Sequence, residues 1–231
     1  MNPPGTATPI KPKAYKSDIK PVWCPGCWDF AVLNAYTKAL AWLALPREDV
    51  AMITGIGCSS RIAAYTSVYG FHGVHGRALA LASGLKAARP DLTVLVAGGD
   101  GDGLSIGGNH FIHACRRNMD LTAGASFIAR GFTGDPNGLA QMLVEAIEHP
   151  GFSFIQVLSP WPTFRPEQTQ WKHQVRPFEG GPTGDPILAA QRIQADDGMS
   201  FGVIYKNDYP VFQPGGSRDG TLADIEAEFG S

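Results

Sequence analysis

The sequence has little charge of either sign, and this scarcity excludes several classes of protein. Charged residues make up 17% of the 231 residues, and the formal net charge is −2. A chain without an excess of basic residues has no electrostatic surface for nucleic acid or an anionic membrane. No apolar run reaches transmembrane length, and residues 1–17 lack the apolar core of a signal peptide. We therefore expect a cytoplasmic protein with no nucleic-acid and no membrane partner.

Cysteine is also scarce. Four cysteines in a chain of this length do not form a secreted disulfide framework, so metal or redox chemistry is the better interpretation. Hydrophobic residues make up 44% of the chain, which is enough for a sizeable core. The low surface charge fits a subunit that buries faces against partners.

Apolar segments of strand and helix type alternate, with short glycine-rich turns between them. This order predicts an α/β fold, doubly wound, with a mainly parallel sheet and helices on both faces. We expect an N-terminal arm (1–20), an α/β domain (21–165) and a C-terminal extension for subunit contacts (166–231). Within these, the expected strands are 50–54, 92–97, 127–129, 152–158 and 201–205, and the expected helices are 30–43, 78–88, 106–117 and 137–148.

The most informative motif is the Gly-Asp loop at residues 98–103, between an expected strand and an expected helix. Its glycines let the backbone approach a ligand closely, and the end of a parallel strand is where α/β proteins bind anions. Its carboxylates are hard oxygen ligands for Mg²⁺, which usually bridges to phosphate. The loop predicts a diphosphate held through a metal. The alternative for Asp100 is a tight turn in which the aspartate caps the next helix.

Three cysteines also lie in loops. Cys24 and Cys27 form a Cys-x-x-Cys pair in a Pro-Gly turn, and Cys58 follows the strand expected at 50–54. Such pairs serve zinc, iron–sulfur clusters or dithiol redox chemistry, and residues 21–23 are a poor match to the strand that a thioredoxin-type site needs. Cys115 lies in an expected helix among apolar residues, so we expect it in the core.

Four histidines are candidate ligands. His75 lies beside Arg77 between a glycine-rich loop (70–76) and a helix start, which suits an anion, although a surface histidine is the alternative. We expect His72 to be structural. His110 and His113 share one helix without a third ligand at suitable spacing, so they are expected on its surface or at an interface.

Taken together, these motifs resemble the β subunit of 2-oxoacid:ferredoxin oxidoreductases. The match rests on four motifs in the family's order and covers most of 21–165. The segments at 165–168 and 171–172 are more similar to the 2-oxoglutarate branch than to the pyruvate branch. The four motifs are Cys24-Pro25-Gly26-Cys27, Gly55-Ile56-Gly57-Cys58-Ser59, His75-Gly76-Arg77-Ala78, and Gly99-Asp100-Gly101-Asp102 with its continuation to Asn118.

The resemblance implies a thiamine diphosphate enzyme whose β subunit holds the diphosphate and Mg²⁺, with an α subunit completing the site. By motif match, Asp100 is the Mg²⁺ ligand, and Gly101 and Asp102 lie against the diphosphate. The match also implies that a 4Fe–4S cluster has Cys24, Cys27 and Cys58 as thiolate ligands. The residues implied to line the cofactor are Ile56, Gly57, Cys58, Ser59 and His75.

The implied reaction is the coenzyme A-dependent oxidative decarboxylation of 2-oxoglutarate, or the reverse carboxylation, with electrons passing through the cluster to ferredoxin. The cofactor carries the bond-breaking chemistry. The implied assembly is an (αβ)₂ heterotetramer. Three alternatives remain: a pyruvate or broad-specificity enzyme of the same family, a non-catalytic assembly subunit, and an unrelated metal-binding module.

The chain departs from the family pattern in two places that matter. The second metal element, an Asn followed by a Tyr-Gly-Met-Thr-like stretch, is absent, because the chain passes from Thr122 directly into Ala123. Mg²⁺ requires six oxygens, which one aspartate and two phosphates do not supply. A mid-strand deletion would break the sheet, so we favour an omitted segment over a loss. Trp161 stands where the fourth cluster cysteine is usual, and Trp28 replaces a usual Gly.

Overall fold

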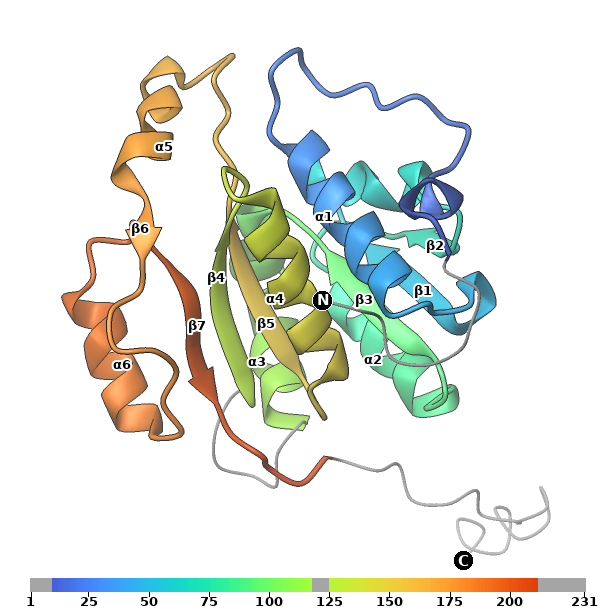
Figure 1. Ribbon diagram of the computed structural model, residues 1–231. Helices are drawn as coiled ribbons and strands as arrows, with labels where there is room; N and C mark the ends of the chain where they lie inside the picture. The colour runs from blue at the N-terminus through green and yellow to red at the C-terminus, as the bar shows by residue number, and fades with distance from the viewer. Residues whose placement is uncertain (1–9, 118–124, 212–231) are drawn as a thin grey trace, which may run out of the picture.

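The computed structural model describes residues 10–117 and 125–211, and it has the α/β architecture expected from the sequence (Figure 1). Two sheets lie side by side, with helices on both faces. The expected strand lead-in at 118–122 and the junction after Thr122 lie outside the described residues. None of the helices in the described ranges is long and apolar enough to cross a membrane.

The bounds of the elements follow the expected segments closely. The strands are β1 (Val50–Thr54), β2 (Tyr69–His72), β3 (Thr93–Ala97), β4 (Phe127–Phe132), β5 (Ser153–Leu158), β6 (Arg176–Pro177) and β7 (Ser200–Lys206). The α-helices are α1 (Asp29–Trp42), α2 (Ala78–Ala88), α3 (Gly108–Arg117), α4 (Pro136–Glu148), α5 (Trp171–Gln174) and α6 (Pro186–Ala195). Short helical turns are η1 (Pro12–Tyr15), η2 (Arg47–Asp49), η3 (Ser59–Tyr65), η4 (Gly101–Ile106) and η5 (Pro166–Gln170).

The first sheet is wholly parallel and has the order β2-β1-β3. Ile53 of β1 is paired with Phe71 on one side and Val96 on the other. Every residue of β1 is buried, as expected for an apolar strand with neighbours on both edges and helices on both faces. The carboxyl ends of β1 and β3 therefore meet at one edge of this sheet, where the glycine-rich loops begin.

The second sheet has the order β5-β4-β7-β6 and mixes directions. β4 and β5 are parallel, whereas β7 runs antiparallel to β4 with a register shift between Ile128 and Ala129. β7 comes from the region 166–231, which we expected to serve subunit contacts. The described part of that region adds β6 and β7 to the sheet, and Ile204 and Tyr205 of β7 are buried. Its role in subunit contacts stays a prediction.

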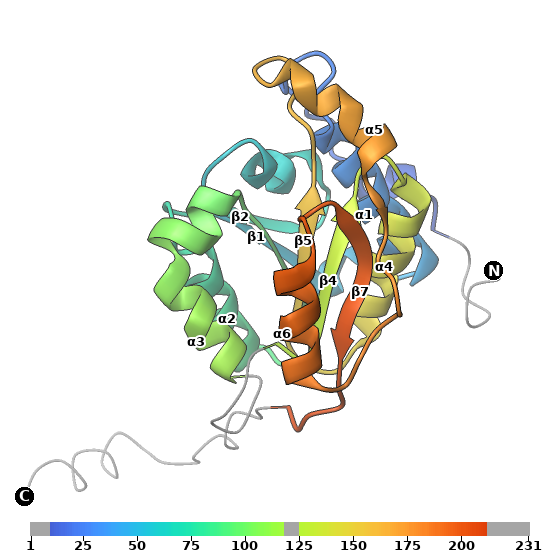
Figure 2. The ribbon, with the colours of Figure 1, turned by 90° about the vertical axis from the view of Figure 1, so that its left-hand side faces the viewer.

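Two helical layers enclose the sheets. α1 and α4 cover one face, and α2 and α3 lie on the other (Figures 1 and 2). The largest core cluster lies under α1 and joins Leu40 to Met52 of β1. Small residues of α2, Ala78 and Ala82, allow close packing on Ile53.

The described end of the expected N-terminal arm is part of this core. Tyr15 is fully buried, and its hydroxyl donates a hydrogen bond to the Leu45 carbonyl at 2.6 Å. The backbone beside it bridges to the segment before β2, where Lys16 pairs with Thr66. Tyr15 at the end of η1 therefore anchors this part of the arm to the domain.

Two local expectations were wrong. The glycine-rich loop at 70–76 begins instead as strand β2, which is exposed along its length, because β1 offers it a parallel edge. The helix expected at 106–117 starts earlier, with the wide π-type turn η4 before α3. The Gly107 N–H donates to the Asp102 carbonyl, five residues back, as in a π-helix.

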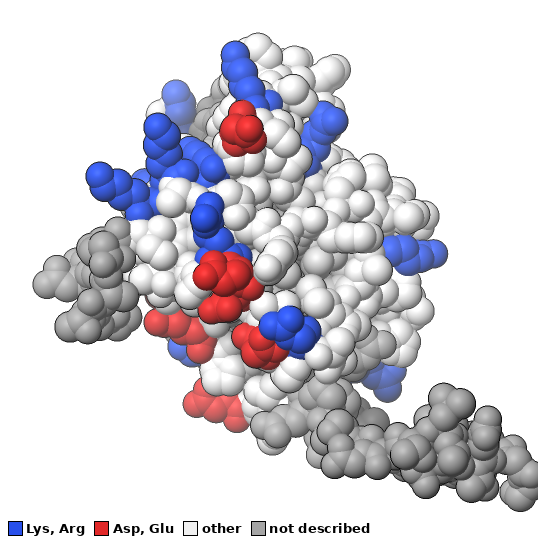
Figure 3. Space-filling model, turned by 90° about the vertical axis from the view of Figure 1, so that its right-hand side faces the viewer, with Lys and Arg blue, Asp and Glu red and all other residues white. Residues whose placement is uncertain are grey.

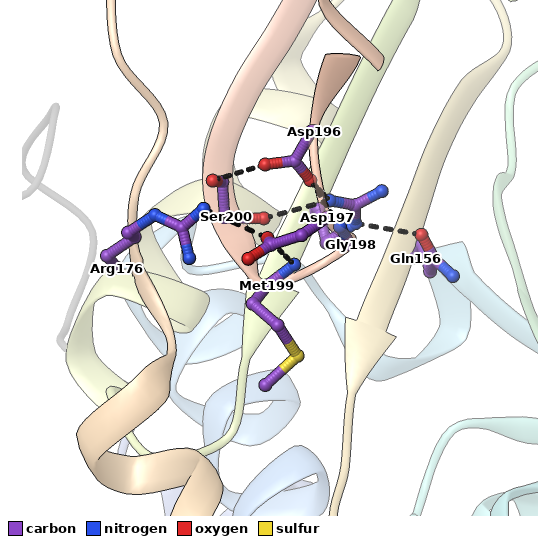
Figure 4. Close-up of polar contacts among 8 residues, drawn as sticks. Gln156, Arg176, Asp196, Asp197, Gly198, Met199 and Ser200 are labelled. Atoms are coloured by element: carbon purple, nitrogen blue, oxygen red, sulfur yellow. Dashed lines mark hydrogen bonds and ion pairs between the residues drawn. The ribbon is translucent and has the colours of Figure 1, made fainter. Parts of the chain in front are cut away.

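A buried ion pair fastens β7 to the rest of the domain. The Arg130 guanidinium of β4 donates to the Asp196 carboxylate at 2.6 Å and to Gln156 of β5 at 3.0 Å. Asp196 also accepts hydrogen bonds from the Ser200 hydroxyl and the Gly198 N–H (Figure 4). The side chains of Arg130 and Asp196 are only 10% and 6% exposed. Burial alone would raise the pKa of Asp196, but these hydrogen bonds hold that pKa below its usual range.

We expect Arg130→Leu to destabilise the protein by about 3–5 kcal/mol, because it leaves the Asp196 carboxylate buried without its cation. The measurement is urea unfolding at pH 7. The matched control is Arg176→Ala, which removes the exposed Arg176–Asp197 pair in the same region and should change the unfolding midpoint little. Equal midpoint shifts in the two variants would contradict this account of β7.

Candidate active site

The candidate site lies at the carboxyl edge of the first sheet, where three glycine-rich loops meet. They follow β1 (residues 55–58), β2 (73–76) and β3 (98–101). Loops at the carboxyl ends of neighbouring parallel strands are brought together by the sheet itself. The backbones of the first and third loops approach so closely that a Cβ built on Gly57 would lie 3.9 Å from the Gly99 nitrogen. Three of the four expected motifs are therefore adjacent in space.

Asp102 is the residue that joins the three loops. Its Oδ1 atom accepts hydrogen bonds from the Ile56 N–H at 2.9 Å and the Gly76 N–H at 2.7 Å, and it lies 2.8 Å from Nδ1 of His75. The residue is 3% exposed. Burial raises the pKa of Asp102, but the two backbone hydrogen bonds and His75 outweigh it and hold the pKa below the usual range. The carboxylate is therefore ionised and shared among the loops.

The glycines around Asp102 allow this close approach. A Cβ on Gly55 would overlap the Asp102 carboxylate, and a Cβ on Gly98 would lie 2.9 Å from its Oδ2 atom. Gly76 has a φ of +72°, and a Cβ there would lie 2.8 Å from the Gly107 nitrogen. Gly55 and Gly98 are therefore required by packing around the Asp102 carboxylate, and Gly76 is required by its positive φ and by the nearby Gly107 backbone.

The two ring nitrogens of His75 have different surroundings. Its side chain is 46% exposed, and Nδ1 faces Asp102. An imidazole that donates from Nδ1 to a carboxylate has its Nε2 atom available for another partner. Within the described residues, Nε2 has no hydrogen-bond partner. The expected role of His75 in lining a cofactor stays a prediction, and this geometry is compatible with it.

Asp100 has the opposite environment from Asp102. It occupies the N-cap position of η4, is exposed, and makes no capping hydrogen bond through its side chain. The capping alternative for Asp100 is therefore not supported. An exposed carboxylate beside glycine-rich backbone fits a Mg²⁺ ligand. It remains a single ligand, because the second metal element expected for the family is absent from the sequence.

The cysteines lie near this edge but are not gathered into one set. Cys24 and Cys27 share a turn closed by the Cys27 N–H and the Cys24 carbonyl, and the Trp23 indole N–H donates to the Cys58 carbonyl at 2.7 Å. Burial raises the pKa of Cys27 to about 11, and the negative charge of the nearby Asp29 adds to this rise. Across residues 10–117 and 125–211, no three His, Cys, Asp or Glu side chains stand close enough to hold a metal ion.

The remaining candidates behave as structural residues. His72 Nδ1 lies 3.0 Å from the Thr54 hydroxyl, and Cys115 is buried. His113 is exposed on α3, as expected. Trp161, at the position of the missing fourth cysteine, is 40% exposed and packs on Phe164 with ring centroids 4.3 Å apart.

The pairing of His75 with Asp102 was not expected from the sequence. The motif match placed Asp102 against a diphosphate, and that contact stays a prediction. The sequence contained one signal for this pairing, the second aspartate of the Gly-Asp-Gly-Asp motif. Two neighbouring carboxylates repel an anionic ligand, so one of them is expected to have another partner. The difference between Asp100 and Asp102 depends on how the three loops are arranged in space.

The residues at this edge of the sheet match a known protein family. Residues 55–125 match the family model described as "Thiamine pyrophosphate enzyme, C-terminal TPP binding domain". The match begins at the loop after β1 and includes the Asp100 and Asp102 positions, so it spans the three loops that Asp102 joins.

Curated relatives are similar over most of the chain. The chain is 39% identical to a 2-oxoglutarate oxidoreductase subunit KorB of Mycobacterium tuberculosis, over 70% of this chain and 56% of that protein's length. It is 30% identical to subunit beta of a 2-oxoacid:ferredoxin oxidoreductase of Aeropyrum pernix, over 84% of this chain and 82% of the relative.

A solved structure has the same fold. A chain of the 2-oxoglutarate:ferredoxin oxidoreductase from Magnetococcus marinus, determined with 2-oxoglutarate, coenzyme A and succinyl-CoA bound, superimposes with a TM-score of 0.81 and 34% identity. The superposition covers 96% of this chain and 91% of that chain.

The alignment lengths also show that some positions of the relatives have no counterpart in this chain. The M. tuberculosis match runs over 207 positions but takes in 70% of 231 residues, or about 162, so about 45 positions have no counterpart in this chain. The A. pernix match runs over 254 positions and takes in about 194 residues, which leaves about 60. Unmatched positions of this number are compatible with the metal element that the sequence lacks.

We expect Asp102→Ala to destabilise the protein by about 1–3 kcal/mol for each of the two backbone N–H groups that lose their acceptor. Because the pKa of Asp102 is lowered by folding, its contribution is present above pH 4 and is lost as the pH falls toward the lowered value. Unfolding curves from pH 7 to pH 3 should therefore be less pH-dependent in Asp102→Ala. An unchanged slope would show that Asp102 does not join the loops in solution.

Proposed function

Since the chain belongs to the family of 2-oxoacid:ferredoxin oxidoreductase β subunits, we propose that it is the β subunit of a 2-oxoglutarate:ferredoxin oxidoreductase. The proposed reaction converts 2-oxoglutarate and coenzyme A to succinyl-CoA and CO₂ while two electrons reduce two ferredoxins, or runs in reverse. The observation that carries the proposal is the joining of three glycine-rich loops by Asp102 within the matched thiamine diphosphate-binding region.

Each loop residue has a proposed task. Asp100 holds Mg²⁺ through its exposed carboxylate, and Gly101 with the loop 56–59 leaves space for the diphosphate. His75 presents Nε2 toward that anion while Asp102 fixes its ring. Asp102 acts mainly as a positioning residue, because its own Oδ1 is occupied by backbone N–H groups. Thiamine diphosphate, when bound, supplies the electron sink for decarboxylation.

An α subunit is the proposed partner, and the surface supports it. Figure 3, which shows the side nearest β2, contains a broad area without Lys, Arg, Asp or Glu. The exposed side chains on β2 and the following loop include Tyr69 at 63%, Phe71 at 53% and Val74 at 71%. Exposed apolar area of this kind is typical of surfaces that contact other subunits. Ferredoxin and an (αβ)₂ assembly complete the proposal.

For the cluster, we propose that Cys24, Cys27 and Cys58 supply three thiolates. Their turns are joined through the hydrogen bond from the Trp23 indole N–H to the Cys58 carbonyl. Burial favours the protonated thiol of Cys27, whereas ligation requires its thiolate. Binding of the cluster would therefore release protons and bring the cysteine side chains closer together. This chain provides no cysteine for the fourth position, where Trp161 stands.

A second candidate function is a non-catalytic assembly subunit. The observation that favours it is that at least about 45 aligned positions of the relatives have no counterpart in this chain. Such a subunit would keep the fold and the partner surface without a complete Mg²⁺ site. Activity and binding measurements distinguish the two candidates.

We expect the complex of this chain with an α subunit of the family to reduce a viologen dye with 2-oxoglutarate, dependent on coenzyme A and prepared without oxygen. Pyruvate should support a much lower rate, and comparable rates would indicate a broad-specificity enzyme. A stable complex with no dye reduction would identify the assembly subunit instead.

The same complex provides a matched test of the metal site. Asp100→Ala should abolish Mg²⁺-dependent binding of thiamine diphosphate in calorimetry, because it removes the one exposed loop carboxylate. Asp91→Ala, which removes an exposed carboxylate paired with Arg89 away from the loops, should leave binding unchanged. Unchanged binding in Asp100→Ala would exclude it as the Mg²⁺ ligand.

Iron content tests the cysteine assignment. We expect Cys58→Ser to lower the iron bound per chain and the broad visible absorbance by more than half, since three ligands become two. Cys115→Ser, which alters a buried cysteine away from the loops, should retain the iron of the unmodified chain. A colourless unmodified chain prepared without oxygen would rule out the cluster.

A further inference from the structure

We propose that the N-terminal arm and the adjoining face of α1 form a docking surface for an acidic protein, the ferredoxin of the proposed reaction. The inference rests on the proposed function and adds to it the part of this chain that the electron acceptor contacts. We call this the lysine surface, and it consists of five exposed side chains: Lys11, Lys13, Lys16, Lys20 and Lys38.

Positive charge is concentrated here although the chain as a whole is slightly acidic. Residues 10–45 contain five lysines and two aspartates, whereas the whole chain has a net charge of −2. Of the two aspartates, Asp29 is partly buried and only Asp18 is exposed. A local excess of one sign attracts and orients a partner of the opposite sign. The acidic remainder of the chain repels an extended polyanion, so a compact acidic protein fits this surface better.

The arm is held against α1, so that its lysines and Lys38 belong to one surface. Tyr15 anchors the arm in the core, and Nζ of Lys16 donates to Oδ1 of Asn34 on α1 at 2.6 Å. Lys38 follows Asn34 by four residues and therefore lies on the same side of the helix. In Figure 3, Lys and Arg side chains gather toward the upper left of the view, and most acidic side chains lie lower.

Apolar side chains lie among these charges, as they do at the centre of a protein interface. Ile19 is 54% exposed and Val22 is 67% exposed. Between the arm and α1 there is a recess of about 220 Å³ whose walls include Lys16, Ile19 and Phe30. A recess with apolar walls and an ammonium group beside it can receive an apolar side chain from an acidic surface.

The lysine surface continues directly into the cysteine turn. Lys20 precedes Cys24 by four residues, and the backbone N–H of Val22 donates to the Tyr65 hydroxyl at 3.2 Å. Cys58, whose carbonyl accepts from the Trp23 indole, is exposed. A protein bound to the lysine surface would therefore lie beside the cysteines proposed for the cluster. Transient electron-transfer complexes have small interfaces, for which one short arm and one helix face are sufficient.

The surface proposed for the α subunit has a different chemistry. The residues of β2 and the following loop, 69–74, contain no Lys, Arg, Asp or Glu, and their exposed side chains are mainly apolar. An apolar surface suits a permanent subunit contact, whereas a charged one suits a partner that binds and leaves. The two surfaces can therefore serve two partners.

The test compares binding of an oxidised acidic ferredoxin to the αβ complex with and without three substitutions, Lys11→Gln, Lys13→Gln and Lys20→Gln. Within the described residues these side chains have no hydrogen-bond partner, so the fold should be unaffected. We expect the Kd from calorimetry to rise at least about tenfold at about 20 mM salt. The difference should shrink at about 300 mM salt, because salt screens exposed charges.

The matched control removes three positive charges away from the arm, by Arg89→Gln, Arg176→Gln and Lys206→Gln. The net charge changes equally, and the Kd should change by less than about twofold. Equal changes in Kd for the two triple variants would overturn the docking surface. Failure of the lysine variant to form the αβ complex would also overturn it, because the α subunit would then be the partner of these lysines.

Dye reduction separates this inference from the proposed function. The lysine variant should reduce a viologen dye with 2-oxoglutarate and coenzyme A at the rate of the unmodified complex, because a small dye needs no docking surface. A rate that falls in parallel with ferredoxin binding would overturn the assignment to docking. Absence of dye reduction by the unmodified complex would contradict the proposed function, and the comparison of Kd values would still decide the docking surface.

Discussion

The arrangement of the candidate site depends on one buried carboxylate. Asp102 accepts from the backbone of the loops after β1 and β2 while belonging to the turn after β3, so three segments far apart in the sequence share one acceptor. The constraint acts in both directions. The loops require glycine where they surround Asp102, and Asp102 requires those backbone N–H groups to remain ionised at low exposure. The exposed position of Asp100, two residues earlier, follows from the same turn.

Much of the fold could be predicted from the sequence because local patterns determine it. The apolar run at β1, the small-residue helix α2 and Pro136 at the start of α4 identify their elements directly. Asp135 caps α4 by accepting from the Gly138 N–H, which completes a signal readable from sequence alone. The meeting of the three loops was also predictable, because parallel strands place their carboxyl ends together.

The remaining features depend on partners that are distant in the chain. The apolar run at 201–205 predicted a strand, but nothing local showed that β7 would pair with β4. The contacts that accompany this pairing, such as that of Arg130 with Asp196, join residues 66 positions apart. Strand β2 was missed because glycine interrupts its sequence pattern. It forms because β1 offers it a parallel partner. The roles of Asp100 and Asp102 could not be separated from composition, since the difference between them is burial and not residue type.

The two unjoined sheets have a consequence for how the domain unfolds. A continuous sheet transmits loss of structure through its hydrogen bonds, so that its strands are lost together. Here the two sheets are connected in the described residues by side-chain packing of helices such as α3 and α4. Side-chain packing couples neighbouring regions less strictly than a shared backbone ladder, so the two sheets are coupled more weakly to each other than the strands within each sheet. Heat or denaturant would then release the two sheets in sequence, with a partly folded species between them.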